Sequence, residues 1–300
     1  MSFVERVLFG EPLRLDRAAR AGLSGTLAQL SDGKTYYEIN GPTSGKPVIL
    51  IHGFSMPSFI WDNTFSALAA AGFKVIRYDL YGRGWSDRPQ ARYDKALFVR
   101  QLAELMEALK LQQASLVSLS MGGVIAAEFA FRFPKRVSGL SFVDPAGFDL
   151  GLPPAVKAVF WPGVGELLLG MLGRMGRKTL LESMLADFYQ PTPEAIESFK
   201  ARYFEQMQYR GFKRALLSSL RSGMLDEDLQ LYRRLGEMDA PVQLIWGELD
   251  DTVPFRHAQT FIRLVPRAEF HPIPQAKHIP HFDRPDVVNP LLIEFLGRAE

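Results

Sequence analysis

The chain of 300 residues contains no cysteine. It can therefore form no disulfide, and it offers no thiolate as a metal ligand or as a catalytic nucleophile. It also has no excess of charge of one sign, because 35 basic residues stand against 33 acidic ones and the formal net charge is +2. Such a balance predicts neither nucleic acid nor another polyanion as a partner.

The sequence also lacks the hydrophobic runs of a membrane protein, since no run reaches the ~18 apolar residues that a spanning helix needs. Residues 1–20 mix Glu5, Glu11 and Asp16 with arginines and have no continuous apolar core. We therefore expect neither a secretory signal nor a transit peptide in this segment. The resulting expectation is a soluble protein without a transmembrane segment, located in the cytoplasm.

Strand-like and helical patterns alternate along most of the chain, and the apolar fraction of 47% is ample for a large core. Continuous apolar runs such as Val48–Ile51 indicate strands buried on both faces. With helices between them, such strands indicate a mostly parallel sheet. The early segments Leu27–Leu30 and Lys34–Ile39 are predicted instead to form an antiparallel hairpin around Ser31–Gly33.

Further strands are predicted at Pro47–Ile51, Phe73–Leu80, Ser115–Ser120, Val137–Val143, Val242–Trp246 and Ala268–Ile273. Helices are predicted at Phe59–Ala71, Lys95–Leu109, Gly122–Phe133, Arg256–Leu264 and Asp286–Leu296. The alternation stops between Pro145 and Pro241, where helical patterns follow one another. We interpret residues 147–235 as a helical cap inserted into the sheet domain, so that residues 1–146 and 236–300 form one discontinuous core. The most apolar part of the cap, Val159–Leu172, is expected to pack on this core, with transient contact with a membrane as the alternative.

The segment Leu116–Gly123 carries the strongest chemical signal. An apolar strand ends at Ser120, the small residues Ser118 and Gly122 stand two places before and after it, and a helical pattern begins at once. A turn from strand to helix within one residue strains the backbone of that residue and pushes its side chain outwards. This is the geometry of a nucleophile elbow, so Ser120 is the predicted nucleophile, provided that a base and an acid accompany it.

A serine nucleophile needs a base, and the chain has five histidines. His278 is the predicted base because it lies between the last predicted strand and the final helix, at the carboxyl edge of the sheet, where loops converge. His281, one turn further on, is the nearest alternative. His271 falls inside a strand pattern and His257 inside a helix pattern, and we assign both to structural roles.

Asp250 is the predicted acid that orients the imidazole of His278. It lies in the turn after the strand that ends at Trp246, again at the carboxyl edge of the sheet. Asp144, at the end of another predicted strand, is the second candidate for this role. Asp251 is expected to cap the helix that follows.

Two backbone N–H groups are predicted to hold the oxyanion of the reaction. One belongs to Met121, which follows the nucleophile at the start of a helix. The other belongs to Phe54, in the loop directly after a buried strand. In that loop Gly53 lets the backbone approach the substrate, and His52 is expected to order the loop by hydrogen bonds.

The order Ser120, Asp250, His278 is the chain order of the α/β-hydrolase superfamily, which the sequence resembles over almost its whole length. The residues that carry the resemblance are His52–Phe54, Arg77–Asp87, the elbow, Trp246–Pro254 and His278–Pro285. The resemblance implies an α/β fold with a mostly parallel eight-stranded sheet, flanking helices and a helical cap inserted after the sixth strand. It also implies hydrolysis through an acyl-enzyme, without a cofactor or a metal ion.

Two positions depart from the common pattern of that family. Ser118 stands where glycine is commonest, and serine is still small enough for the elbow. Lys277 precedes the predicted base where glycine is also commonest. Its positive charge is predicted to lower the pKa of His278.

The expected reaction is the hydrolysis of a small-molecule carboxylic ester, of the esterase or monoacylglycerol-lipase type. Apolar cap residues favour an apolar acyl or alcohol group; they are Phe148, Phe160, Trp161, Leu168, Met171, Met184 and Phe188. A C–C bond hydrolase of ring-cleavage diketones ranks lower, because Ile279 stands where those enzymes usually carry tryptophan and Phe54–Met56 replaces their Gly-rich loop. A catalytically silent binding protein on the same fold is the third hypothesis.

Overall fold

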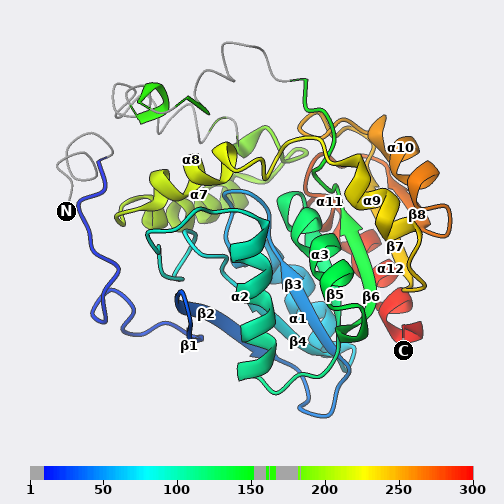
Figure 1. Cartoon of the computed structure of the whole chain (residues 1–300), viewed down its shortest axis with the longest axis horizontal. Coiled ribbons are helices and arrows are strands. Elements are labelled where there is room, and N and C mark those ends of the chain that lie inside the picture. Colours follow the sequence, from blue (N-terminus) through cyan, green and yellow to red (C-terminus); the bar gives the residue numbers. More distant parts are fainter. Residues whose placement is uncertain (1–9, 152–159, 162, 167–181, 183, 300) are drawn as a thin grey trace.

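Runs of buried aliphatic side chains form the centre of an eight-stranded sheet (Figure 1). The structure, a computed structural model, describes residues 10–151, 160–161, 163–166, 182 and 184–299. All residues of β5 and of β7 are buried, because helices cover both faces of the sheet. The strands are β1 (Thr26–Leu30), β2 (Gly33–Asn40), β3 (Pro47–Ile51), β4 (Lys74–Tyr78), β5 (Ala114–Leu119), β6 (Val137–Val143), β7 (Val242–Gly247) and β8 (Glu269–Ile273).

The strand order in the sheet is β1-β2-β4-β3-β5-β6-β7-β8. β2 pairs antiparallel with β1 and with β4, and all neighbours from β4 to β8 pair in parallel. The predicted hairpin and the predicted mostly parallel sheet are thus confirmed. Because the parallel strands share one direction, the loops that follow them converge at one edge of the sheet.

A layer of helices covers each face of the sheet. α2, α3, α9 and α10 pack on one face, and α1 and α12 pack on the other (Figure 1). The bounds of these helices are α1 (Asp62–Ala70), α2 (Lys95–Ala108), α3 (Met121–Arg132), α9 (Leu229–Gly236), α10 (His257–Leu264) and α12 (Pro285–Arg298). Two short 3-10 turns, η2 (Ser58–Trp61) and η3 (Pro134–Arg136), precede α1 and β6, and α11 (Pro280–Asp283) precedes α12.

Local side-chain contacts explain where two of these helices begin. α2 starts after Asp94, whose carboxylate accepts a hydrogen bond from the N–H of Leu97 at 3.0 Å. The helix predicted from Phe59 starts instead as the tighter turn η2, because the N–H of Ser58 donates to Asp79 Oδ1 at 2.9 Å. The regular helix α1 follows only after that turn.

The segment between β6 and β7 forms the expected cap. Its helices α7 (Pro193–Met207) and α8 (Phe212–Arg221) lie over the carboxyl edge of the sheet (Figure 1). α9, which follows them, packs instead against α3 and α10 beside the sheet. The cap residues Leu168 and Met171, and most of the apolar stretch Val159–Leu172, lie outside the described residues.

An N-terminal arm joins the core to the cap through Glu11. The Glu11 side chain is buried, and its two oxygens accept hydrogen bonds from the N–H groups of Gly211 (2.6 Å) and Lys213 (2.7 Å). Burial raises the pKa of Glu11 to about 7, although both hydrogen bonds act in the opposite direction. The carboxyl group therefore satisfies N–H groups that the start of α8 would otherwise leave free.

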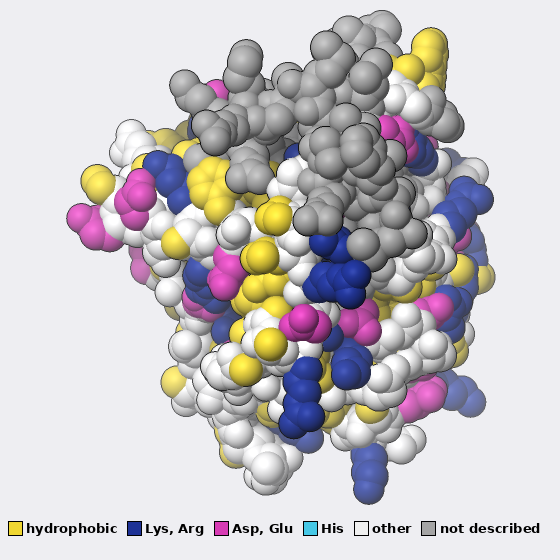
Figure 2. All heavy atoms as spheres, turned by 90° about the vertical axis from the view of Figure 1, so that its left-hand side faces the viewer, with side chains coloured by type: hydrophobic (Ala, Val, Ile, Leu, Met, Phe, Trp, Pro, Cys, Tyr) yellow, Lys and Arg dark blue, Asp and Glu magenta, His cyan; other side chains and the backbone are white. Residues whose placement is uncertain are grey.

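The surface shows no field of one sign on the face seen in Figure 2, where basic and acidic side chains are interspersed. Among the described residues, the large exposed apolar side chains are Leu13, Ile39, Phe131, Trp161 and Leu249. Among the residues that the structure describes, no helix has both the length and the apolar composition needed to cross a bilayer.

The closest approach of α3 to β3 depends on Gly122. A Cβ atom at this position would lie 2.6 Å from the carbonyl oxygen of Ile51 and 2.7 Å from that of His52. Both neighbours are backbone atoms and cannot rotate away. We therefore expect Gly122→Ala to lower the free energy of unfolding by about 1–3 kcal/mol, as overpacking does elsewhere.

Gly297→Ala is the matched control for this prediction. A Cβ atom at Gly297, in α12, would meet nothing within 4 Å. This variant is expected to raise the free energy of unfolding by up to about 1 kcal/mol, because alanine favours the helix. Urea unfolding monitored by circular dichroism measures both, and equal effects of the two substitutions would contradict the close approach.

Candidate active site

Ser120 occupies the one-residue turn between β5 and α3. Its φ of 52° and ψ of −121° are rare for a residue with a side chain, so its backbone is strained. Neighbouring backbone holds the turn, since the Ser120 N–H donates to Val143 O (3.0 Å) and its carbonyl accepts from the N–H groups of Gly123 (2.8 Å) and Ala146 (3.0 Å). The backbone has the elbow geometry that the small residues around Ser120 indicated.

Asp250 and His278 lie together at the carboxyl edge of the sheet, on the loops after β7 and β8. His278 Nδ1 is 2.8 Å from Asp250 Oδ2, and both side chains are almost fully buried. Because an ionised carboxylate only accepts, Nδ1 carries the proton between them and Nε2 is left free to act as a base. Asp250 Oδ1 accepts from the N–H groups of Thr252 (2.8 Å) and Val253 (3.0 Å), which fixes the carboxylate.

The loop that carries Asp250 and the loop that carries His278 can pack closely because Gly247 has no side chain. A Cβ atom there would lie 2.1 Å from the carbonyl oxygen of Lys277 and 2.7 Å from that of Ala276. The N–H of Leu249 also donates to Ala276 O at 3.0 Å. Backbone contact thus aligns the two loops from which Asp250 and His278 project.

The pKa of His278 is set by burial and by two carboxylates. Burial lowers this pKa, but the charge of Asp250, the hydrogen bond to it and the charge of Asp187 together raise it to about 9. The sequence predicted a lowered pKa because of Lys277, and that prediction is wrong. The Lys277 ammonium group donates to the carbonyl of Ala186 in the cap (3.0 Å), and the two carboxylates outweigh its charge.

Phe54 and Met121 carry the N–H groups predicted to bind the oxyanion. Met121 is the first residue of α3, where N–H groups have no acceptor within the helix. Phe54 lines the same cavity as Ser120 and His278. A Cβ atom on Gly53 would lie 3.2 Å from Ser120 Cβ, so this loop runs directly beside the nucleophile. The structure brings both residues to the nucleophile, and their role as donors stays a prediction.

Two buried side chains hold the Phe54 loop. His52 Nδ1 donates to Gly53 O and its Nε2 accepts from the N–H of Leu80, each at 2.9 Å, so His52 orders the loop as predicted. Burial lowers the pKa of His52 to about 3, so the ring stays neutral and keeps this tautomer. The sequence assigned no role to Arg83, yet its Nε donates to Phe54 O at 2.7 Å.

Arg83 also reaches the cap. Its Nη1 donates to Tyr81 O (3.2 Å) and its Nη2 to Ser219 Oγ on α8 (2.9 Å), and the whole side chain is buried. Burial lowers the pKa of Arg83 to about 10, which leaves the group charged at neutral pH. The sequence did contain a signal for Arg83, because this arginine stands between two glycines within Arg77–Asp87, a segment that carries the family resemblance.

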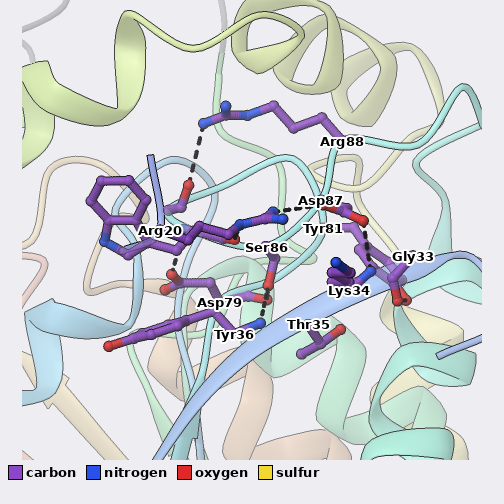
Figure 3. A network of polar contacts seen from close by, with 12 residues as sticks. Arg20, Gly33, Lys34, Thr35, Tyr36, Asp79, Tyr81, Ser86, Asp87 and Arg88 are labelled. Carbon is purple, nitrogen blue, oxygen red and sulfur yellow. Dashed lines mark hydrogen bonds and ion pairs between the residues drawn. The ribbon is translucent and has the colours of Figure 1, made fainter. Parts of the chain in front are cut away.

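The loop after β4, which carries this arginine, is fastened to β2 by polar contacts (Figure 3). Ser86 Oγ donates to the carbonyl of Asp79 (2.5 Å) and accepts from the N–H of Tyr36 (2.9 Å). Asp87 accepts from the N–H of Lys34 at 2.7 Å. These contacts hold the loop against the sheet. They therefore fix the position from which Arg83 bonds to the Phe54 loop.

A cavity of about 100 Å³ opens at Ser120 and His278. Most of its wall is apolar, formed by Phe54, Met56, Leu119, Leu150, Met184, Leu225, Val253 and Ile279. The described residues of this wall include neither lysine nor arginine, but they include the buried carboxyl group of Asp187 from the cap. Asp187 accepts a hydrogen bond from Thr252 Oγ1, and the sequence assigned it no role.

Asp144, the alternative acid, lies at the end of β6 beside Asp250. Its Oδ1 accepts from the N–H of Gly247 at 2.9 Å, and the hydrogen bond to His278 comes from Asp250. One nitrogen or oxygen of each of these three titratable side chains lies within 4.8 Å of those of the other two. The separation of 2.8 Å between Nδ1 and Oδ2 is that of a hydrogen bond, and we assign no metal ion to this group.

The other histidines near this edge take no part in the cluster. His281 is the second residue of the short helix α11, and its ring packs against that of Trp61 at an interplanar angle of 32°, with ring centroids 4.0 Å apart. Burial lowers the pKa of His281 to about 3. His271 lies in β8 and His257 in α10, the strand and helix that the sequence predicted for them.

The predicted helix cap at Asp251 is wrong. A turn separates Asp251 from α10, whose N-cap residue is Arg256 and has no side-chain cap bond. The neighbouring Asp250 accepts the N–H bonds of that turn instead.

The geometry of the chain agrees with comparisons to known proteins. The family model described as "Alpha/beta hydrolase family" matches residues 48–291. A "Putative 2-succinyl-6-hydroxy-2,4-cyclohexadiene-1-carboxylate synthase" of Bacillus subtilis (strain 168) is 28% identical over 289 residues, which cover 89% of this chain and 96% of that protein. The "2-hydroxy-6-oxo-6-phenylhexa-2,4-dienoate hydrolase" of Comamonas testosteroni is 28% identical over 274 residues, covering 89% of this chain and 92% of that protein.

A solved structure has a similar fold. It is that of a membrane phospholipase A, described as a novel bacterial virulence factor. The likeness has a TM-score of 0.73 at 26% identity and covers 98% of this chain and 92% of that one. Together with the family match over most of the chain and the eight-stranded sheet, these findings show that the chain belongs to the alpha/beta hydrolase family.

Proposed function

We propose that the protein hydrolyses neutral carboxylic esters with an apolar acyl or alcohol group, through an acyl-enzyme on Ser120. The observation that carries this proposal is the cavity that Ser120 shares with His278. Its wall is mostly apolar, and its described residues include neither lysine nor arginine to pair with an anionic substrate. The phospholipase A likeness supports the same class of reaction, because a phospholipase A cleaves a carboxylic ester.

The proposed reaction uses the three side chains in turn. Ser120 Oγ attacks the ester carbonyl carbon while His278 Nε2 takes the hydroxyl proton, and the oxyanion is held by the N–H groups of Phe54 and Met121. The tetrahedral intermediate collapses by breaking the C–O bond, and His278 gives the proton to the leaving alcohol. Water then repeats the sequence on the acyl-enzyme and releases the acid, while Asp250 keeps the imidazole oriented throughout.

A C–C bond hydrolase is the second candidate, and the named relative from Comamonas testosteroni favours it. The substrate in that name is a dienoate and therefore carries a carboxylate. In this chain the described residues of the cavity wall include the carboxyl group of Asp187 and neither lysine nor arginine. A like charge so close to the substrate carboxylate opposes its binding, which ranks the neutral ester first.

Removal of the nucleophile tests the proposed chemistry. We expect Ser120→Ala to reduce kcat/KM for p-nitrophenyl butyrate by at least about a thousandfold, because no acyl-enzyme can form. Ser118→Ala is the control, since Ser118 lies two residues away but its Oγ bonds within the sheet to Ser141 O at 3.3 Å. It should keep its activity within about threefold, since it removes only that one hydrogen bond.

The same pair of variants separates an enzyme from a silent binding protein. A fluorophosphonate should label the wild type and Ser118→Ala but not Ser120→Ala. Folded wild-type protein that neither labels nor hydrolyses the ester would favour the binding protein.

The raised pKa of His278 predicts the pH dependence of the reaction. Only the neutral imidazole can accept the serine proton, so kcat/KM falls as the pH falls through the pKa of His278. Because Asp250 and Asp187 raise this pKa from 6.5 to about 9, the acid limb of the profile should lie on the alkaline side of 6.5. Stopped-flow rates of p-nitrophenyl butyrate hydrolysis between pH 5 and pH 10 check this, and a midpoint at or below 6.5 contradicts it.

The carboxyl group of Asp187 predicts which substrates are rejected. We expect Asp187→Asn to raise kcat/KM for p-nitrophenyl hemisuccinate relative to p-nitrophenyl butyrate by about tenfold, or roughly 1.4 kcal/mol, since a like charge is removed. Because both esters are measured on the same variant, any change in the reactivity of His278 cancels from the ratio of their kcat/KM values. Asp251→Asn, an exposed neighbour outside the cavity, should leave the ratio unchanged, and an equal ratio in all three proteins would remove the case against anionic substrates.

A further inference from the structure

Asp144 places a second buried carboxyl group against Asp250. Asp144 is completely buried, and its φ of 42° sets it in a sharp turn directly after β6. Its Oδ1 accepts from the N–H of Gly247 at 2.9 Å. Its Oδ2 is buried, and no donor of the described residues reaches it. An oxygen of Asp144 lies within 4.8 Å of an oxygen of Asp250.

Two ionised carboxylates cannot remain in contact in such a place without a cation. The titratable groups that face Asp144 are Asp250 from the loop after β7, His278 from the loop after β8 and Asp283 from α11. Burial and the charge of Asp250 raise the pKa of Asp144 well above its ordinary value. Among the strongest influences on Asp144, only the Gly247 N–H favours its ionised form. One of the two carboxyl groups therefore holds a proton.

The surroundings of Asp250 decide which group holds it. Asp250 Oδ1 accepts two N–H groups, from Thr252 and Val253, and Oδ2 faces His278 Nδ1 at 2.8 Å. Each of these donors stabilises the ionised carboxylate. Asp144 accepts one N–H and has a free oxygen, so the proton belongs on Asp144.

We propose that Asp144 is a neutral carboxylic acid at the working pH and donates a hydrogen bond from its O–H to the carboxylate of Asp250. The inference rests on the proposed role of Asp250 as the partner of His278. A carboxylate that accepts this further donor shares its charge more widely, so it raises the pKa of His278 less than it otherwise would. Asp144 is thus a positioning residue, which acts on His278 through Asp250 and moves the base towards neutral pH.

The proton on Asp144 is not consumed in the reaction. His278 takes the proton of Ser120 and gives it to the leaving alcohol, and Asp144 keeps its own proton through both steps. Asp144 therefore affects the pKa of His278, and so the pH range in which His278 can act as a base, but it does not change the products.

Two substitutions at Asp144 separate charge from hydrogen bonding. Asp144→Asn keeps an oxygen for the Gly247 N–H and supplies an N–H to Asp250, and asparagine tolerates a positive φ. Asp144→Leu supplies neither. If Asp144 is neutral, the acid limb of the pH–rate profile should stay within about 0.3 pH unit in the asparagine variant, and it should rise by about 0.5–1 unit in the leucine variant.

The opposite charge state gives a different result. If Asp144 is ionised, Asp144→Asn removes a negative charge close to the imidazole, and the acid limb falls by about one unit or more. That outcome overturns the proposal, and so does a leucine variant that folds and keeps the wild-type limb. If the leucine variant does not fold, the asparagine variant still decides the charge state.

Infrared spectroscopy gives a readout that a purely structural role would not move. The wild-type minus Asp144→Asn difference spectrum at pH 8 should contain the carbonyl band of a neutral carboxyl group. Asp251→Asn is the control, because it makes the same substitution at an exposed residue. Absence of the neutral band in the first difference spectrum overturns the proposal.

The test is separable from the proposed ester hydrolysis. The acid limb can be measured from the rate of fluorophosphonate labelling of Ser120, which needs no ester substrate. If Ser120 does not label, NMR titration of the imidazole, assigned with His278→Gln, gives the same pKa without any reaction. If the protein hydrolyses no ester but shows these pKa shifts, the proposed function is wrong and the inference about Asp144 stands. If it hydrolyses the ester but shows none of these shifts, the inference is wrong and the proposed function stands.

Discussion

The active-site arrangement depends on how closely α3 can pass β3. Gly122 allows this approach, because the carbonyl oxygens of Ile51 and His52 lie where a side chain would begin. The approach sets the strained turn at Ser120 beside the loop that carries Phe54. Two backbone hydrogen bonds hold that strain: the Ser120 N–H donates to Val143 O, and the Ser120 carbonyl accepts from the N–H of Ala146 in the loop after β6. The elbow is therefore maintained both by its own residue Gly122 and by backbone contacts with the neighbouring strands β3 and β6.

Much of this frame could be predicted from the sequence because it depends on local patterns. The run Val48–Ile51 indicates a buried strand whatever surrounds it, and the small residues around Ser120 indicate a tight turn. Parallel strands end at one edge of a sheet, so Asp250 and His278 could be assigned to that edge without knowledge of any contact. The strand and helix boundaries were less predictable, since η2 depends on an N–H bond to an aspartate in a distant loop.

The remaining features depend on contacts between residues far apart in the chain. Such contacts cannot be predicted from local sequence patterns. Arg83 reaches Phe54, and Asp187 enters the cavity wall from the cap. The prediction for Lys277 failed for the same reason, because sequence shows that Lys277 adjoins His278 but not where its ammonium group goes. Asp144 was considered only as an alternative to Asp250, whereas the structure places oxygens of the two carboxyl groups within 4.8 Å of each other.

The buried guanidinium group of Arg83 donates hydrogen bonds both to the Phe54 loop and to Ser219 on α8. If α8 moves away, the guanidinium loses its bond to Ser219 in a place that little water reaches, and such a loss is costly. The position of the cap and the alignment of the Phe54 N–H are therefore thermodynamically linked. One buried side chain thus joins the Phe54 loop to the cap, two segments that lie far apart in the chain.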